Sequence, residues 1–380
     1  MIYLDNGATT FPKPVPVTAS VNNALKYSSA NPGRGGHKMA IKASEIVYNS
    51  RIKIAEMFKV SDPSSIIFTN NCTTALNTVI KGVLNNGDHV IISSLEHNAV
   101  LRPVEKLKKR GISYSIAEVV ENDDEKTIDN FRACINENTK LAVCTAASNV
   151  FGIKPPYERI CALCHQYGIL TCVDAAQGGG VFNFNLSMSS IDYLCLAGHK
   201  GLYGPMGTGV LIINCDTIPD SLTEGGTGSN SADFNQPLVL PDRFESGTVN
   251  FPGIAGLGAG VDFVKRRGIE NIYKHELNLV QLIYSNLKNM DSVELYTEYP
   301  VNGKYAPVIS FNIKGRDCEE IAETLSEKYN IAVRSGLHCA PLAHKSMNTF
   351  EKGTIRAVPS IFTAKQDIYR FVAALSKIIT

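Results

Sequence analysis

The stretch Asp192-Tyr193-Leu194-Cys195-Leu196-Ala197-Gly198-His199-Lys200-Gly201-Leu202-Tyr203-Gly204-Pro205 decides the fold predicted for this chain. An apolar, strand-like run ends in two small residues, and His199 and Lys200 follow directly. A glycine-rich turn comes next, and a second apolar run extends from Gly209 to Ile213. A lysine at the mouth of a buried strand is desolvated, which lowers the pKa of its ammonium group. The stretch therefore predicts an amine that can form a Schiff base with a carbonyl group.

A second strand-like run, from Gly168 to Val173, stops at Asp174. The distance in sequence between Asp174 and Lys200 leaves room for a strand crossover, which places both side chains at one rim of an open sheet. Pyridoxal 5′-phosphate needs such a pair, a lysine for its aldehyde carbon and an acid for its pyridinium nitrogen. The alternative is that Asp174 caps a helix and Lys200 is an ordinary loop lysine.

The composition describes a globular protein without a strong attraction for charged polymers. The chain has 380 residues, too many for one ordinary core, so we expect two subdomains. It has 44% hydrophobic residues, 19% charged residues and a formal net charge of +1. No apolar run reaches membrane-spanning length. We therefore expect neither nucleic acid nor a membrane as a partner.

The 10 cysteines indicate a reducing compartment. Most lie inside apolar runs, as Cys144, Cys172 and Cys195 do, and are expected to pack as small core side chains. No signal-peptide pattern opens the sequence, so we expect a cytoplasmic protein without a disulfide framework. Cys161 and Cys164 have the spacing of a zinc or redox pair, but they lie in a helical pattern without a second pair, and no metal site is expected.

Strand and helix patterns alternate from residue 65 to residue 174, which is typical of a mostly parallel sheet covered by helices on both faces. Strands are predicted at 65–69, 89–93, 113–119, 141–145 and 169–174, with helices at 73–84, 99–110, 128–135 and 156–167. Helices are also expected at 17–27 and 39–58. The segment 223–249 is rich in glycine and small polar residues and predicts a long functional loop.

The pattern changes after Gly253. Helices are predicted at 254–267, 269–289 and 318–328 and from residue 366, with strands near 293–296, 308–312, 331–334 and 354–357. We therefore expect an N-terminal segment (1–15) that packs near the small domain and the active site, a large α/β domain (16–253), and a small α+β domain (254–380) that carries Cys339 and Arg356.

Polar residues follow several of the predicted strands. Thr73 and Thr74 open a helix, whose N-terminal N–H groups suit an anion, although a threonine cap is an equally good explanation. His97 could stack on a planar ring, although a lone histidine is more often structural. Asn149 follows the next strand along the same rim. Together these strand ends predict a binding site for a small molecule.

Arg334-Ser335-Gly336-Leu337-His338-Cys339-Ala340 is a polar loop, unlike the apolar surroundings of the other cysteines. Exposure and the positive neighbours Arg334 and His338 are expected to lower the pKa of the Cys339 thiol and make its thiolate available. The alternative is an incidental loop cysteine. Arg356 follows a strand-like run and could hold a carboxylate bidentately, or form a surface ion pair.

These motifs resemble, over essentially the whole chain, the class V enzymes of fold-type I that use pyridoxal 5′-phosphate. Within that group the chain is similar to the SufS-type (group II) cysteine desulfurases and selenocysteine lyases. The residues that carry the resemblance are 198–200 with 203–205, 173–177, 95–98, 334–339, the loop Arg34-Gly35-Gly36-His37, and Phe244-Glu245-Ser246-Gly247-Thr248. The implied fold is α/β, with a large, mostly parallel, seven-stranded sheet and a smaller α+β C-terminal domain.

The resemblance also implies the roles of single residues. Lys200 would carry the cofactor and move the Cα proton, Cys339 would attack the substrate sulfur, and His97 would stack on the ring. Cofactor contacts are implied for Lys200, Asp174, Gln177, His97, Thr73, Thr74, His199 and Thr248, the last from the partner subunit of a homodimer. Substrate contacts are implied for Asn149, Arg356, Arg334 and His37.

Two departures from the family pattern stand out. Ala197 occupies a position where the family often has a phosphate-binding serine, and Ala357-Val358-Pro359-Ser360 replaces the commoner run after Arg356. The implied reaction converts L-cysteine to L-alanine and leaves a persulfide on Cys339 for a sulfur-acceptor protein that the sequence does not identify. Alternatives are a selenocysteine lyase acting on L-selenocysteine, a class V aminotransferase without sulfur chemistry, and an idle scaffold for iron–sulfur assembly, which intact Lys200 and Asp174 argue against.

Overall fold

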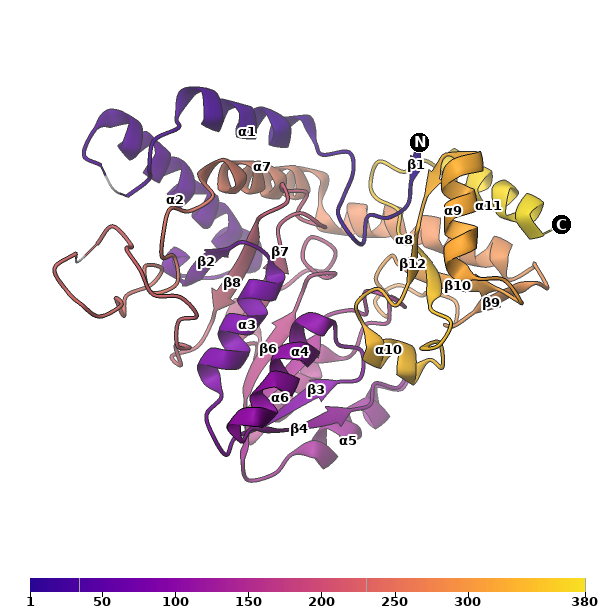
Figure 1. Ribbon diagram of the computed structural model, residues 1–380, viewed down its shortest axis with the longest axis horizontal. Helices are drawn as coiled ribbons and strands as arrows, with labels where there is room; N and C mark the ends of the chain where they lie inside the picture. Colours follow the sequence, from indigo (N-terminus) through magenta and orange to yellow (C-terminus); the bar gives the residue numbers. More distant parts are fainter. Residues whose placement is uncertain (34, 230, 380) are drawn as a thin grey trace.

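A seven-stranded sheet lies at the centre of the larger part of the computed structural model, which describes residues 1–33, 35–229 and 231–379 (Figure 1). The order across the sheet is β2 (Ile66–Thr69), β8 (Gly209–Ile213), β7 (Tyr193–Ala197), β6 (Leu170–Asp174), β5 (Thr139–Thr145), β3 (His89–Ser93) and β4 (Ser113–Ala117). Only β8 runs antiparallel to its neighbours among these described strands. The predicted large, mostly parallel sheet is confirmed.

Both faces of this sheet are buried. Successive side chains of a strand point to opposite sides, so a strand whose residues are all buried, as in β7, is covered on both faces. Along β7, Leu194 and Leu196 join one hydrophobic core, whereas Tyr193, Cys195 and Ala197 join the other. This explains why the strand has no polar residue at any of its positions. A fully apolar strand therefore signals a sheet with helices on both sides.

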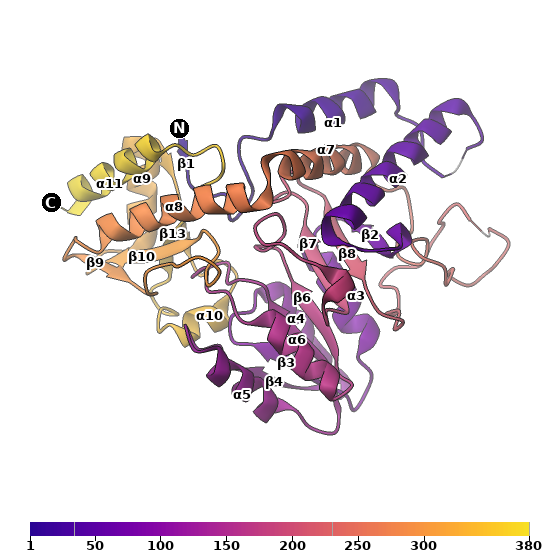
Figure 2. The same ribbon diagram turned by 180° about the vertical axis from the view of Figure 1, so that it is seen from behind.

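Helices cover each face (Figure 2). One face is covered by α3 (Cys72–Val83) and α4 (Asn98–Leu107). The other is covered by α2 (Lys38–Phe58), α5 (Asp124–Cys134), α6 (Tyr157–Gln166) and α7 (Phe251–Arg267). Helix α1 (Val15–Tyr27) packs along α7. Cys161 and Cys164 are free, buried thiols within α6.

The smaller part contains a four-stranded antiparallel sheet in the order β12 (Arg334–Gly336), β13 (Thr354–Ala357), β10 (Ile309–Ile313) and β9 (Val293–Leu295). Its core is shared with α8 (Ile269–Leu287), α9 (Cys318–Tyr329) and α11 (Lys365–Ile379). Because α7 packs against α1 and α2, we propose that the boundary between the two parts lies at Gly268 rather than after residue 253. The short helix α10 (Pro341–Ser346) was not predicted.

The N-terminal segment, residues 1–14, runs between the two parts (Figure 1). Strand β1 (Ile2–Tyr3) pairs in parallel with β11 (Ile331–Ala332) of the smaller part. Further along, the backbone of Thr10 and the side chain of Lys13 donate to the carbonyl of His199, at 3.1 and 2.8 Å. The segment therefore contacts the smaller part at one end and the decisive glycine-rich stretch at the other.

The long loop 223–249 has neither helix nor strand at its described positions. It is anchored at Glu245, whose carboxylate pairs with buried Arg51 at 2.8 and 2.9 Å and accepts the Phe68 N–H at 2.8 Å. A paired and hydrogen-bonded buried carboxylate holds a loop in one place more firmly than a surface ion pair does. Across the described chain, no helix is both long and apolar enough to span a bilayer.

Candidate active site

The carboxyl ends of β5, β6 and β7 and the N-termini of α3 and α4 open onto one cavity, called here the strand-end cavity. Polar side chains from separate elements converge there, as expected at the ligand-binding edge of an open α/β sheet. The predicted site residues that line it are Thr73, His97, Asn149, Asp174, Gln177, His199 and Lys200. Ala197 lines it as well.

Lys200 and Asp174 follow neighbouring parallel strands, so both reach the same cavity. Desolvation lowers the pKa of the Lys200 ammonium group, and the nearby Arg356 guanidinium lowers it further, whereas Asp174 acts in the opposite direction. A lowered pKa increases the fraction of neutral amine near neutral pH. Lys200 is thus suited to attack a carbonyl carbon or to accept a proton.

Asp174 is held by a residue that the sequence did not single out. The Cys72 thiol donates to Asp174 Oδ1 across 3.4 Å, and the Ala176 N–H donates to the same oxygen at 2.9 Å. Burial raises the pKa of the Cys72 thiol well above its usual value, so the thiol stays a neutral donor. Because Cys72 lies in an ordinary helix start, no sequence signal distinguishes it from a core cysteine.

His97 is the N-cap of α4, and its Nδ1 accepts the Ala99 N–H at 3.0 Å. This bond places the ring proton on Nε2. Burial lowers the pKa of His97 and keeps the ring neutral. Neighbouring Glu96 ties two strand ends together, since its Oε1 accepts from the Ser93 hydroxyl at 2.5 Å and the Thr145 N–H at 2.7 Å. Burial raises the pKa of Glu96 to about 8.

A histidine that lines the same cavity, His199, has a ring nitrogen suited to a ligand. His199 Nδ1 is buried and has no hydrogen-bond partner among the described residues. Burial, Lys200 and Lys13 together lower the pKa of His199 to about 4. A buried polar atom without a partner is costly, so this nitrogen is suited to a ligand. Thr73 lies nearby at the start of α3, whose N-cap Asn71 accepts the Thr74 N–H at 2.8 Å.

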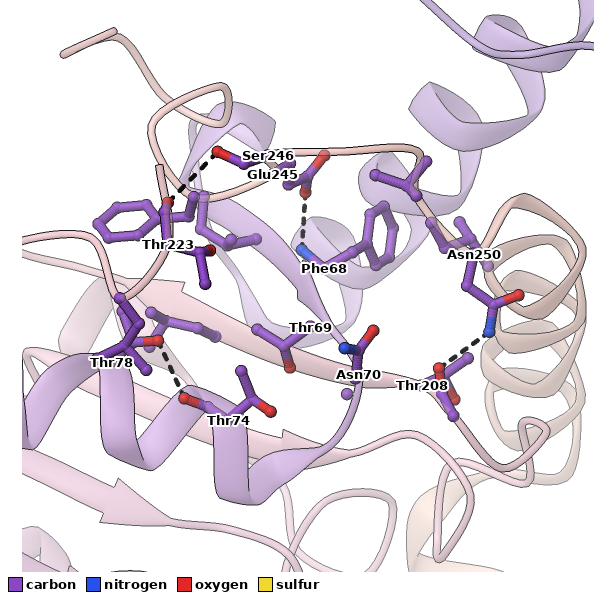
Figure 3. A pocket seen from close by; sticks show the side chains of 18 of the residues that line it. Phe68, Thr69, Asn70, Thr74, Thr78, Thr208, Thr223, Glu245, Ser246 and Asn250 are labelled. Atoms are coloured by element: carbon purple, nitrogen blue, oxygen red, sulfur yellow. Dashed lines mark hydrogen bonds between the residues drawn. The ribbon is translucent and has the colours of Figure 1, made fainter. Parts of the chain in front are cut away.

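Thr74 and Thr248 do not line the strand-end cavity. They line a neighbouring pocket between α3, β8 and the loop 223–249, shown in Figure 3. Its wall carries many hydroxyl and amide groups, among them those of Thr69, Asn70, Thr78, Thr208, Ser246 and Asn250. Thr248 Oγ1 accepts from Asn31 Nδ2 of the same chain at 3.3 Å.

Cys339 is the exposed member of the 10 cysteines. Its sulfur lies 3.9 Å from a terminal nitrogen of Arg334. The loop is docked on the larger part, because the Asn98 N–H donates to the Cys339 carbonyl at 2.7 Å and Asn149 Nδ2 donates to the His338 carbonyl at 2.8 Å. Cys339 thus lies beside the start of α4, next to the strand-end cavity.

The expected contribution of His338 to the Cys339 thiolate is wrong. His338 is buried, its Nε2 lies 3.0 Å from the Thr354 carbonyl oxygen, and its ring stacks on His344 at 5.8 Å. Burial lowers the pKa of His338 to about 2, so the ring carries no positive charge near neutral pH. Arg334 is therefore the cation that contacts the thiol.

Arg356 is fully buried instead of forming a surface ion pair. One terminal nitrogen donates to the Asn149 carbonyl at 2.7 Å and the other to Asp5 Oδ1 at 2.9 Å. Its Nε is buried without a hydrogen-bond partner in the described part of the chain. Arg334 lies directly opposite Arg356 in the β12–β13 pair, which brings both arginines to one place.

His37 lies apart from this group. It is exposed, and it caps α2 by accepting the Ala40 N–H at Nδ1, at 3.3 Å. It does not line the strand-end cavity described for this chain. Its loop neighbour Arg34 lies outside the described residues.

A second cavity lies beside the first, and Gln177 and Lys200 line both. Glu276 of α8 lies on its wall, almost fully buried, and accepts the Tyr203 hydroxyl at 3.0 Å. Burial raises the pKa of Glu276 to about 8, compared with 4.5 for an ordinary glutamate. The folded protein therefore binds this proton more tightly than the unfolded chain does.

Glu276→Gln is expected to change how stability depends on pH. The stability that the Glu276 proton gives to the folded state is fully present below about pH 4.5 and is lost as the pH rises toward 8. Glutamine cannot ionise but still accepts the Tyr203 hydroxyl. Between about pH 5 and pH 8 the variant should gain about 2–4 kcal/mol in unfolding free energy relative to the parent. Urea unfolding at both pH values measures this. A gain equal to that of the exposed control Glu270→Gln would contradict the assignment.

The fold and the cavity together define an α/β protein with a desolvated lysine beside a buried aspartate at the strand ends. The family model of class-V aminotransferases matches residues 2–371. The chain therefore belongs to the class-V aminotransferase family.

Relatives that are named cysteine desulfurases align with nearly the whole of this chain. A probable cysteine desulfurase of Methanothermobacter thermautotrophicus is 32% identical, over 99% of this chain and 94% of the relative. One from Pyrococcus abyssi is 33% identical, over 100% of this chain and 94% of the relative. The apo structure of the cysteine desulfurase from Thermococcus onnurineus NA1 superposes with a TM-score of 0.88 at 30% identity, covering 100% of this chain and 94% of the other.

Proposed function

We propose that the protein is a cysteine desulfurase that uses pyridoxal 5′-phosphate to convert L-cysteine to L-alanine and collects the sulfur on Cys339. The observation that carries the proposal is the exposed Cys339 thiol, in contact with Arg334 and docked beside the cavity that holds Lys200 and Asp174. The relatives named cysteine desulfurase support it. The group II assignment remains part of the proposal.

The residues of the strand-end cavity fit this cofactor. Lys200 is a desolvated amine for the aldehyde carbon, and Asp174 is a buried carboxylate for the ring nitrogen. The unpartnered His199 Nδ1 and the start of α3 at Thr73 are suited to the phosphate. His97 would lie against the ring and Gln177 at its hydroxyl. When bound, the cofactor stabilises negative charge that develops at the substrate Cα.

The side chains of the site have separate roles in the proposed reaction. Lys200 would hold the cofactor through its amine and is placed to take the proton from the substrate Cα. Asp174 would pair with the ring nitrogen of the cofactor, and Cys72 and Ala176 hold its carboxylate in place. Arg356 and Asn149 orient the substrate carboxylate, for which the unpartnered Nε of Arg356 is a free donor. Arg334 is suited to assist at the same end, beside Cys339.

Cys339 then accepts the sulfur. Its thiolate attacks the substrate Sγ, an S–S bond forms, and the Cβ–S bond breaks with its electron pair left on carbon. Protonation of that carbon and return of the proton from Lys200 to Cα complete L-alanine, and Cys339 carries a persulfide until an acceptor thiol takes the outer sulfur. L-Cysteine and one thiol thus give L-alanine and one persulfide. A transaminase without sulfur chemistry would need no such exposed thiol beside the site.

We further propose a homodimer. Large apolar side chains are exposed on α1, on α2 and on the loop 223–249: Val15, Leu25, Tyr27, Met39, Ile41, Tyr48, Phe234, Leu238 and Val239. Exposed apolar surface of this extent favours an interface. His37 and Thr248 belong to the same region, which supports the idea that each acts in the partner's site. Light scattering should give twice the chain mass, and a fully active monomer would contradict the proposal.

The proposed function is tested with purified protein loaded with pyridoxal 5′-phosphate. Given L-cysteine and a reductant, it should release L-alanine and sulfide in equal amounts. A parallel reaction with L-selenocysteine measures the preference between the two substrates. Keto-acid formation from L-cysteine without sulfide would instead indicate a transaminase.

A further inference from the structure

We propose that Asp5 of the N-terminal segment is a positioning residue that sets how tightly Arg356 binds the α-carboxylate of substrate and product. The proposal rests on the proposed function, because it assumes that Arg356 receives an amino-acid carboxylate. It assigns a role in ligand affinity to a residue that lies far from Arg356 in sequence.

The contacts of the Arg356 guanidinium carry the argument. The Asn149 carbonyl accepts a hydrogen bond from one terminal nitrogen, and Asp5 Oδ1 accepts one from the other. Nε has no partner among the described residues. A guanidinium presents its donors as a rigid planar fork. Fixing both terminal nitrogens therefore fixes the direction in which Nε and the remaining hydrogen of the neighbouring nitrogen point. Nε is therefore the donor that is left for a carboxylate while Asp5 and the Asn149 carbonyl keep their bonds.

The position of Asp5 is itself fixed by its neighbours. Asp5 forms a β-bridge with Val358, and the Val358 N–H donates to the Leu4 carbonyl at 2.6 Å. Asn6 Nδ2 donates to the Val358 carbonyl at 2.9 Å. A methyl group at Gly7 would lie 3.1 Å from the Arg356 guanidinium carbon, so the segment is packed directly on this side chain. Asp5 consequently has little freedom to move away when a ligand binds.

The charges around the site explain what Asp5 does. Burial and, to a smaller extent, Arg334 lower the pKa of the Arg356 guanidinium, and Arg356 in turn contributes to the lowered pKa of Lys200. Asp5 is the acid that contacts the guanidinium. A buried arginine without a partner is costly, which would make it bind any carboxylate tightly. With Asp5 in place, an incoming carboxylate meets a charge that is already partly balanced. Because L-cysteine and L-alanine carry the same α-carboxylate, Asp5 weakens product retention together with substrate binding.

Two substitutions separate charge from orientation. The substitution Asp5→Asn keeps a side-chain oxygen that accepts from Arg356 but removes the negative charge. The charge of Arg356 is then less balanced, so the dissociation constant for L-alanine should fall about tenfold. Asp5→Ala removes the oxygen too and frees the guanidinium to turn, so this constant should rise about tenfold relative to Asp5→Asn. Asp262→Asn, in an exposed pair with Lys53, is the matched control and should leave affinity unchanged.

The experiment is calorimetric titration of the loaded protein with L-alanine and, separately, with ethylamine, which lacks the carboxylate. Only the L-alanine values should respond to the substitutions at Asp5. Equal changes for both ligands, or no change in Asp5→Asn, would overturn the inference. If Asp5→Ala does not fold, Asp5→Asn alone decides. Wild-type protein that makes no alanine from L-cysteine would contradict the proposed function instead, so the two failures are distinguishable.

Discussion

Cys339→Ala is expected to lose sulfur transfer while keeping the cofactor. In the proposed reaction the Cys339 thiolate is the nucleophile that breaks the Cβ–S bond, and Cys339 is the exposed cysteine of the described chain. Formation of L-alanine and sulfide from L-cysteine should fall about 100-fold or more, as it does when a covalent nucleophile is removed elsewhere. Binding of pyridoxal 5′-phosphate should not change, since Cys339 does not line the cavity.

Mass spectrometry after a single turnover without reductant gives the sharpest measurement. The parent should carry one added sulfur on the peptide that contains Cys339, and the variant should carry none. Cys134→Ala, which removes a partly exposed thiol outside the cavity, is the matched control and should keep full activity. Added sulfur on any other cysteine, or an undiminished rate in Cys339→Ala, would identify a different nucleophile. L-Selenocysteine is assayed separately, because selenium leaves more readily than sulfur without a protein nucleophile and its cleavage should be spared in the variant.

Lys200→Ala is expected to abolish turnover. In the proposed reaction the Lys200 amine serves twice, first as the covalent attachment point and then as the base at Cα, and its lowered pKa suits both roles. Loss of the proton-transfer role alone costs about 10²–10⁴ in rate. The variant should still fold, because removing this amine also removes a desolvated charge from the interior.

Borohydride reduction followed by peptide mass spectrometry tests the attachment. The parent should gain the mass of the reduced cofactor on the peptide that contains Lys200, and Lys200→Ala should gain none. Lys304→Ala, which removes a lysine paired with Asp124 at the surface, should behave like the parent. Reduced cofactor on another lysine, or more than a tenth of the parental rate in Lys200→Ala, would contradict the assigned role.

The sheet could be predicted because its strands are apolar along their whole length. The strand 89–93 was predicted with its observed bounds, and the crossover between Asp174 and Lys200 places them on neighbouring strands as expected. Helix starts were less accurate, since capping side chains determine them. Helix α5 begins at Asp124 rather than 128 because Asp123 accepts the Lys126 N–H, and polar residues at a helix start leave no apolar pattern.

Other features depend on contacts that are distant in sequence. The single strand predicted at 331–334 is divided, because Ile331 pairs with the N-terminal strand and Arg334 with β13. Helix α10 has six residues, too few for a periodic pattern. His338 looked like a cation in a polar loop, and only its packing on His344 and Thr354 makes it neutral. Likewise, the thiol of Cys72 and the carboxylate of Asp5 gain their roles from partners that no local pattern reveals.

The N-terminal segment has a consequence for how the chain is made on the ribosome. Its residues are synthesised first, yet Lys13 contacts His199, β1 contacts β11, and Asp5 contacts Arg356. Lys13 can be placed once residue 199 has emerged, whereas Asp5 must wait until more than nine-tenths of the 380 residues have been translated. The partners on the Lys200 side of the site are therefore synthesised well before those on the Arg356 side. Arg356 meets its acid only when translation is nearly complete.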